Sequence, residues 1–247
     1  RKSILDKKSD HVKDKKYGFF HSQNTFFDEV ANELGMVDSN GEYMRHPLAY
    51  LVEAADDICY TLIDFEDGIN LGWISEEYAL EFLIRLVKDS IDTKKYNSLK
   101  HKTDRVAYLR ALSVNTLIND TVKIFLKNEE KILNGDFTKT LLSESVFKAQ
   151  MKDIIDISVR KVYNSKEVIE KELKGYQVIH KLLSVFIKAS VNNQSDNTTA
   201  LDDLVLSSLP QAYIHKDGNL YDQLLDISCF VASLTDGNAL EWYNKIS

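Results

Sequence analysis

Six acidic side chains occupy one short stretch of the chain that contains no lysine or arginine: Glu53, Asp56, Asp57, Asp64, Glu66 and Asp67. If the stretch is helical, Asp56, Tyr60 and Asp64 follow one another at intervals of one turn and share one side of the helix. Carboxylates one turn apart repel each other, and a bound cation or a cationic partner would relieve that repulsion. Magnesium and manganese ions prefer carboxylate oxygens, and a mixed histidine and aspartate site also suits iron, cobalt or nickel.

The same acids also have a simpler interpretation. Every amphipathic helix has a polar face, and acids on that face are usually only solvated. The pair Ala54 and Ala55, directly before Asp56, favours a site, because small side chains let another element approach the acids closely.

The element that must position these residues is a helix from Pro47 to about Asn70, ending near Gly72. Proline suits the first turn of a helix, and His46 before it falls at the N-cap position. Apolar residues recur at intervals of three and four and predict the buried stripe, opposite the acids: Leu51, Ala55, Ile58, Leu62, Phe65 and Ile69.

The rest of the chain also predicts helices, because apolar residues recur at helical spacing and only two prolines and nine glycines interrupt them. We expect an all-α fold, with loops at 35–45 and 192–199 and with Ser75 as an N-cap. The further helices are expected at about 23–34, 75–90, 103–127, 141–163, 165–191, 199–208, 219–229 and 236–246.

Composition is that of a globular protein, with 247 residues, 44% of them hydrophobic and 28% charged. The formal charge of -7 argues against a protein that coats nucleic acid, which needs a net basic face. No apolar run is long enough to span a bilayer. The two cysteines, Cys59 and Cys229, lie among apolar residues, and we expect both to be buried and reduced in a cytoplasmic protein.

Residues 45–60, RHPLAYLVEAADDICY, continue into DFEDG at 64–68 and closely resemble a signature segment of the deoxyguanosine triphosphate triphosphohydrolases, in the HD-domain superfamily. Weaker similarity covers most of the chain: KYGFF at 16–20, RVAYLRA at 105–111, NTLI at 115–118, and LTD and ALEWY near the C-terminus. The C-terminal part departs from the family pattern at residues 233–234 and 237–238.

This resemblance implies an HD-type core with a C-terminal helical subdomain, and hydrolysis of a deoxynucleoside triphosphate to the deoxynucleoside and tripolyphosphate. It implies that Asp56 is a metal ligand, that Tyr60 packs on the deoxyribose and that Asp64 binds the 3′-hydroxyl. Lys16 matches a lysine that contacts the phosphates, whose negative charge requires cationic partners. The implied cofactor is a divalent metal ion, Mn or Mg, with Fe, Co or Ni as alternatives.

Family members hold the metal with one histidine, a His-Asp pair and one later aspartate. The chain contains six histidines but no His-Asp pair, and for each histidine a surface or capping role is expected. We therefore interpret the chain as the C-terminal half of a longer enzyme, inactive alone and without catalytic residues other than this ligand. Residues 1–130 are expected to belong to the catalytic core and residues 131–247 to the C-terminal subdomain.

The sequence leaves two other functions open: a non-enzymatic helical regulatory or interaction module, and a hydrolase of the same superfamily that acts on another nucleotide. The expected partners are a dNTP, with dGTP preferred, and further copies of the chain in a dimer or hexamer. Nucleic acid is expected only as an effector, and no membrane is expected.

Overall fold

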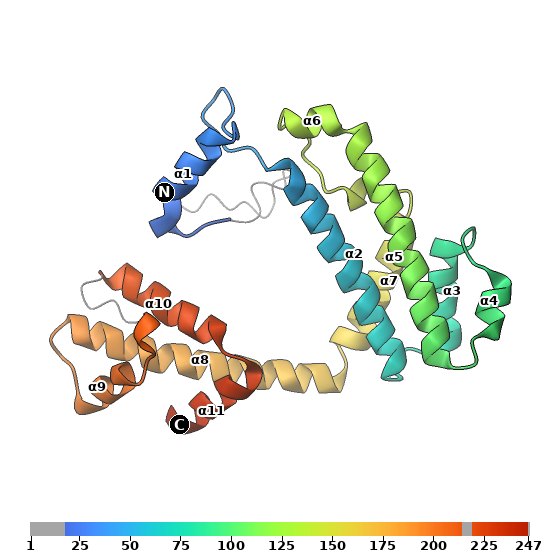
Figure 1. The fold of residues 1–247 in the computed structure, drawn as a ribbon. Helices are drawn as coiled ribbons and strands as arrows, with labels where there is room; N and C mark the ends of the chain where they lie inside the picture. Colours follow the sequence, from blue (N-terminus) through green and yellow to red (C-terminus); the bar gives the residue numbers. More distant parts are fainter. Residues whose placement is uncertain (1–17, 214–218, 247) are drawn as a thin grey trace. The chain divides into compact units, whose positions relative to one another are not determined.

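Figure 1 shows a computed structural model that describes residues 18–213 and 219–246, and it is built of helices. The all-α prediction is confirmed. Among the described residues, β-type pairing is limited to one antiparallel bridge, between Val37 and Tyr43. The α-helices are α1 (Asn24–Glu33), α2 (Pro47–Asn70), α3 (Glu76–Val87), α4 (Thr93–Ser98), α5 (Lys102–Lys127), α6 (Glu129–Leu133), α7 (Lys148–Ser158), α8 (Lys166–Gln194), α9 (Ala200–Ser207), α10 (Leu220–Ser233) and α11 (Asp236–Ile246).

The chain divides into two compact units, and the boundary in sequence lies between Ser165 and Lys166. Unit 1 contains α1 to α7, and unit 2 contains α8 to α11. The segment after residue 130 belongs to unit 1 by packing, because α7 contacts α2 and α3. The expected division near residue 130 into a catalytic core and a C-terminal subdomain concerns function, and it stays a prediction.

Helix α2 begins and ends where the sequence predicts. Pro47 is its first residue, and His46 caps it by accepting a hydrogen bond from the Leu48 N–H to Nδ1, at 3.2 Å. The chain leaves the helix at Gly72, whose φ of +79° lies in the left-handed region that glycine adopts without strain.

The buried face of α2 is rotated slightly from the predicted stripe. Ile58, Leu62, Phe65 and Ile69 are buried as expected, but Ala55 is exposed and Leu51 is only half-buried. The remaining buried positions are Tyr50, Ala54, Thr61 and Gly68. The buried face differs from the predicted stripe because α2 packs on both α5 and α7, and the residues of α2 that contact either helix are buried.

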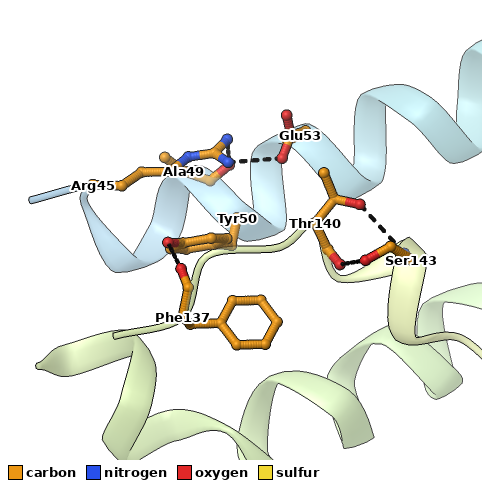
Figure 2. A network of polar contacts seen from close by, with 7 residues as sticks. All are labelled: Arg45, Ala49, Tyr50, Glu53, Phe137, Thr140 and Ser143. Carbon is orange, nitrogen blue, oxygen red and sulfur yellow. Dashed lines mark hydrogen bonds and ion pairs between the residues drawn. The ribbon is translucent and has the colours of Figure 1, made fainter. Parts of the chain in front are cut away.

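The first turns of α2 rest on the segment after α6, through a smaller core cluster that includes Tyr50, Ala54 and Phe137. Figure 2 shows the Tyr50 hydroxyl donating to the Phe137 carbonyl, at 2.5 Å, while the two rings meet edge to face. Burial is the main cause that raises the pKa of Tyr50 above its ordinary value. This bond fixes the start of α2 to a segment far along the chain.

The predicted helix over 141–163 is three pieces in the structure. A short 3-10 turn, η3 (Leu142–Glu144), precedes α7, and a π-helical turn, η4 (Val159–Tyr163), follows it. The sequence does not predict the short helix α4, because its six residues contain too few apolar side chains to show a helical period.

The prediction that both cysteines are buried is wrong. Cys59 is exposed on α2 and Cys229 is half-buried, and both are free thiols. Cys59 lies among apolar neighbours in sequence, but it faces away from α5 and α7, and its outward position follows from the rotated packing face.

Unit 2 is organised around α8. Helices α9, α10 and α11 all contact it, and the core contains Leu182, Phe186 and Phe230. Phe186, Phe230 and Trp242 meet edge to face in pairs, with ring centroids 5.4 to 5.7 Å apart. None of the helices that the structure describes is long and apolar enough to cross a membrane.

Candidate functional site

The outward side of α2 carries the row predicted from the sequence. Asp56 and Tyr60 are exposed, Tyr60 to 61%, and Asp64 is half-buried. The three side chains are successive turns of one rigid helix, so their spacing does not depend on loop conformation. This row is a surface of unit 1 that combines two carboxylates with a phenol.

Tyr163 joins this row from η4, and no local sequence pattern predicts it. Its hydroxyl donates a hydrogen bond to Asp64 Oδ2, and its ring lies 6.2 Å from the Tyr60 ring, centroid to centroid. Burial, and next the hydrogen bond to Asp64, raise the pKa of Tyr163 far above its ordinary value. Tyr163 therefore remains a neutral hydrogen-bond donor and fixes the orientation of the Asp64 carboxylate.

The close approach of η4 to α2 depends on Gly68. A Cβ at this position would lie 2.6 Å from Cγ2 of Val162 and 2.9 Å from Cδ1 of Ile74. Any larger residue would push the π-helical turn away from α2. Gly68, one turn after Asp64, thus permits the contact between Tyr163 and Asp64.

Arginines from outside the helix relieve part of the repulsion among the acids. Arg45 forms an ion pair with Glu53 at 2.8 Å (Figure 2), and its guanidinium also lies 4.5 Å from the centre of the Tyr50 ring. Arg110 of α5 approaches Glu66 to 2.7 Å, without the alignment of a hydrogen bond. At the two ends of the acidic stretch, therefore, arginines of this chain are the cationic partners that reduce the repulsion among the acids.

Asp56 differs from these acids, because its carboxylate has no hydrogen bond or ion pair with any residue that the structure describes. Its exposed carboxylate is accessible to a cation, which fits the role of one metal ligand. Over 18–213 and 219–246, however, no three His, Cys, Asp or Glu side chains gather as a metal site. Asp56 can supply one ligand, and the described residues do not supply the set.

The surroundings of Asp56 are apolar rather than polar. On the outward side of α2, Val52 is 68% exposed and Ile63 is 42% exposed, and Leu48 and Cys59 are also exposed. By helical geometry these residues share one side with Asp56. Helix α2 is thus apolar on two faces, which is typical of a helix that is covered on both.

The other predicted site residue cannot be placed. Lys16 lies outside the described residues, as do His11 and His215. His46 has the capping role that the sequence suggested. The roles of Lys16, Asp56, Tyr60 and Asp64 remain predictions.

A pocket of about 450 Å³ lies elsewhere in unit 1, between α1 and the turn that follows it. Asn24, Asp28 and Asn32 of α1 line one side, and Val37 and Tyr43 line the other. None of the residues in the row on α2 contributes to it.

By fold and site, the chain is an all-helical protein that presents a carboxylate, a phenol and a second carboxylate along one helix. A protein of Synechocystis sp. named deoxyguanosinetriphosphate triphosphohydrolase-like is 30% identical over 94% of the chain. A protein of the same name from Listeria monocytogenes is 28% identical over 99% of the chain. The deoxyguanosinetriphosphate triphosphohydrolase of Serratia proteamaculans is 30% identical over 70% of the chain. No family model matches.

These likenesses cover both units and show that the chain is related to the deoxyguanosinetriphosphate triphosphohydrolases. The chain spans about half the length of the curated relatives it matches, 52% of the Synechocystis protein and 57% of the Listeria protein.

Proposed function

We propose that the chain is part of a metal-dependent triphosphohydrolase that converts a deoxynucleoside triphosphate, with dGTP preferred, to the deoxynucleoside and tripolyphosphate. The observation that carries the proposal is the relationship to proteins named for this reaction over nearly the whole chain. The carboxylate of Asp56, which has no partner among the described residues and lies one turn before an exposed tyrosine, is the chemical feature that fits it.

Asp56 is the one residue of the described chain that we assign as a metal ligand. The other ligands, a histidine and a His-Asp pair, would come from polypeptide beyond these 247 residues. A divalent ion held there, Mn or Mg or else Fe, Co or Ni, supplies Lewis-acid polarisation of the phosphate and activation of water.

Tyr60, Asp64 and Tyr163 act on the sugar in this proposal. The exposed face of the Tyr60 ring packs against the deoxyribose, where a 2′-hydroxyl would not fit. Asp64 accepts a hydrogen bond from the 3′-hydroxyl, and Tyr163 holds the Asp64 carboxylate in position from the other side. Lys16 contributes positive charge toward the phosphates, which carry most of the substrate's charge.

The proposal places this enzyme in the cytoplasm as a homo-oligomer, a dimer or a hexamer. Nucleic acid enters only as an effector, because the net charge of -7 disfavours extensive phosphate binding.

The test is a phosphorus NMR assay of the intact protein with each deoxynucleoside triphosphate and Mn or Mg. The proposal expects tripolyphosphate as the single phosphorus product, formed in one step. Release of pyrophosphate or monophosphate would favour a hydrolase of the same superfamily with another substrate. A folded protein that turns over none of the substrates would favour a regulatory or interaction module.

A further inference from the structure

The pocket beside α1 lies between two walls that contacts within unit 1 hold in place. Along one wall, Asn24, Asp28 and Asn32 follow one another at intervals of about one helical turn. The other wall includes Tyr43, whose ring packs edge to face on Phe27 of α1, with centroids 5.0 Å apart. The volume of about 450 Å³ between these walls is the size of a preformed site for a small molecule.

Hydrogen bonds along α1 determine which atoms of the two asparagines face a ligand as acceptors. Asn24 donates from Nδ2 to Oδ2 of Asp28, at 2.8 Å, and Asn32 donates from Nδ2 to the Asp28 carbonyl, at 2.7 Å. Because a carboxylate and a carbonyl only accept, neither amide can be flipped without losing its bond. The amide oxygens of Asn24 and Asn32 and Oδ1 of Asp28 remain as acceptors, and none of them receives a hydrogen bond from a described residue.

The charge around the pocket favours a cation. Residues 18–44, which include every residue that lines the pocket, contain no lysine or arginine. Five acids lie in the same segment: Asp28, Glu29, Glu33, Asp38 and Glu42. A phosphate or carboxylate ligand would meet repulsion there, whereas a positively charged donor meets acceptors along a whole wall. The Tyr43 ring offers further attraction to an organic cation that lies on its face.

The spacing of the acceptors distinguishes an organic cation from a metal ion. A metal ion needs its oxygen ligands within one coordination sphere, and no three His, Cys, Asp or Glu side chains gather in the described residues. Side chains one turn apart on a helix are about 6 Å apart at Cβ. An extended four-carbon chain separates two ammonium groups by a similar distance. The acceptors of Asn24 and Asp28, with that of Asn32 one turn later, therefore match a diamine better than a single ion.

We propose that this pocket binds an aliphatic diamine or polyamine, a ligand that goes beyond the proposed nucleotide hydrolysis. One ammonium group donates to Oδ1 of Asp28 and to the amide oxygen of Asn24, and the charge of Asp28 provides the main attraction. The second ammonium group, about one helical turn away, donates to the amide oxygen of Asn32. Val37 gives the opposite wall an apolar surface for the carbon chain between them.

Isothermal titration calorimetry of the 247-residue chain with putrescine, at low ionic strength, tests the proposal. Saturable binding at a single site is expected. Butylamine, which has the same carbon chain and a single ammonium group, is expected to bind at least about tenfold more weakly.

Asp28→Asn is expected to weaken putrescine binding at least about tenfold, because the charged acceptor is lost. Glu29→Gln is the matched control, since it removes one negative charge from the next residue of α1, which does not line the pocket. This control should bind putrescine as the native chain does. Circular dichroism of each variant checks that the helical content is retained.

Asn32→Ala tests the second ammonium group separately. Asn32 is exposed, so the fold should persist. Putrescine binding is expected to fall toward that of butylamine, while butylamine binding stays unchanged because it uses only the acceptors of Asn24 and Asp28. Equal effects on the two ligands would overturn the placement of the second ammonium group.

The absence of saturable binding by the native chain would overturn the proposal. So would equal losses in Asp28→Asn and Glu29→Gln, which would indicate a general attraction of cations to a chain with a net charge of -7. Tighter binding of N-acetyl-lysine amide than of putrescine would overturn the diamine and identify a lysine side chain of another polypeptide as the occupant. None of these measurements depends on nucleotide turnover, so they stand apart from the proposed function.

Discussion

At the scale of single residues, the acidic side chains of α2 differ in whether another residue of the fold holds them. Asp64 receives a hydrogen bond from Tyr163, and Glu53 and Glu66 are paired with arginines. Asp56 has no partner among the residues that the structure describes. This difference separates the effect of a substitution on activity from its effect on stability.

Asp56→Asn is expected to abolish metal-dependent turnover in the intact protein, because the amide is a poorer ligand than the carboxylate. The free energy of unfolding should change by no more than about 0.5 kcal/mol, as for other exposed positions. Phosphorus NMR and thermal unfolding measure the two effects. Asp67→Asn, an exposed acid on the same helix, is the control and should leave turnover intact. Undiminished turnover by the Asp56 variant would remove Asp56 from the metal site.

Tyr60→Ala is expected to reduce discrimination between deoxynucleotides and ribonucleotides, because the ring that would collide with a 2′-hydroxyl is gone. The ratio of kcat/KM for the two substrates measures the effect. The exposure of 61% means that little packing is lost, so the fold should persist. An unchanged ratio would show that Tyr60 does not contact the sugar.

Tyr163→Phe removes the hydrogen bond to Asp64 and is expected to cost about 0.5 to 1.5 kcal/mol of stability. Discrimination against substrates without a 3′-hydroxyl should fall, because Asp64 loses its fixed orientation. The pKa of Tyr163 is raised in the folded state, so the contribution of this group to the free energy of unfolding is fully present below the ordinary tyrosine pKa. This contribution is lost as the pH rises from that value toward the pKa of the folded state. Urea unfolding from pH 8 to 11 should show a smaller alkaline loss in the variant, and equal losses would contradict the assignment.

At the scale of elements, the ends of α2 could be predicted from the sequence because local residues determine them. Pro47 fixes the start, and Gly72 supplies the left-handed residue at the end. The contact between Tyr163 and Asp64 could not be predicted, because 99 residues separate the two and no local pattern links them. The rotated face of α2 also depends on partners, α5 and α7, that only the tertiary structure identifies.

Two substitutions of the same kind should have opposite effects on stability. Gly68→Ala places a methyl group 2.6 Å from Val162, and the crowding is expected to cost about 1 to 3 kcal/mol and to move η4 away from α2. Gly175→Ala on α8 meets nothing within 4 Å and should stabilise the chain by about 0.5 to 1 kcal/mol. Denaturant unfolding of both variants measures the sign, and a neutral Gly68 variant would show that η4 can withdraw without cost.

At the scale of the whole molecule, the resemblance in sequence identified the family, and the all-helical class followed from the spacing of apolar residues. Neither the resemblance nor the spacing predicts which apolar residues of α2 are exposed. Spacing alone does not tell which of two apolar faces of a helix packs inside the chain. Leu48, Val52 and Ile63 are exposed on the same helix that buries Phe65 and Ile69.

Cys59 on this exposed face provides a test of whether further polypeptide covers it. In the 247-residue chain with Cys229→Ser, the exposed Cys59 should react with a thiol reagent at the rate of an unhindered cysteine. In an intact protein that supplies the remaining metal ligands, the same thiol should react at least about tenfold more slowly, because burial in an apolar interface limits the access of the reagent to the sulfur. Val52→Asp should restore fast reaction by placing a charge in that interface, whereas Val146→Asp, at a valine of similar exposure outside α2, should not. Equal rates in the short and the intact protein would mean that the apolar face stays open, and that the residues completing a metal site around Asp56 do not approach across it.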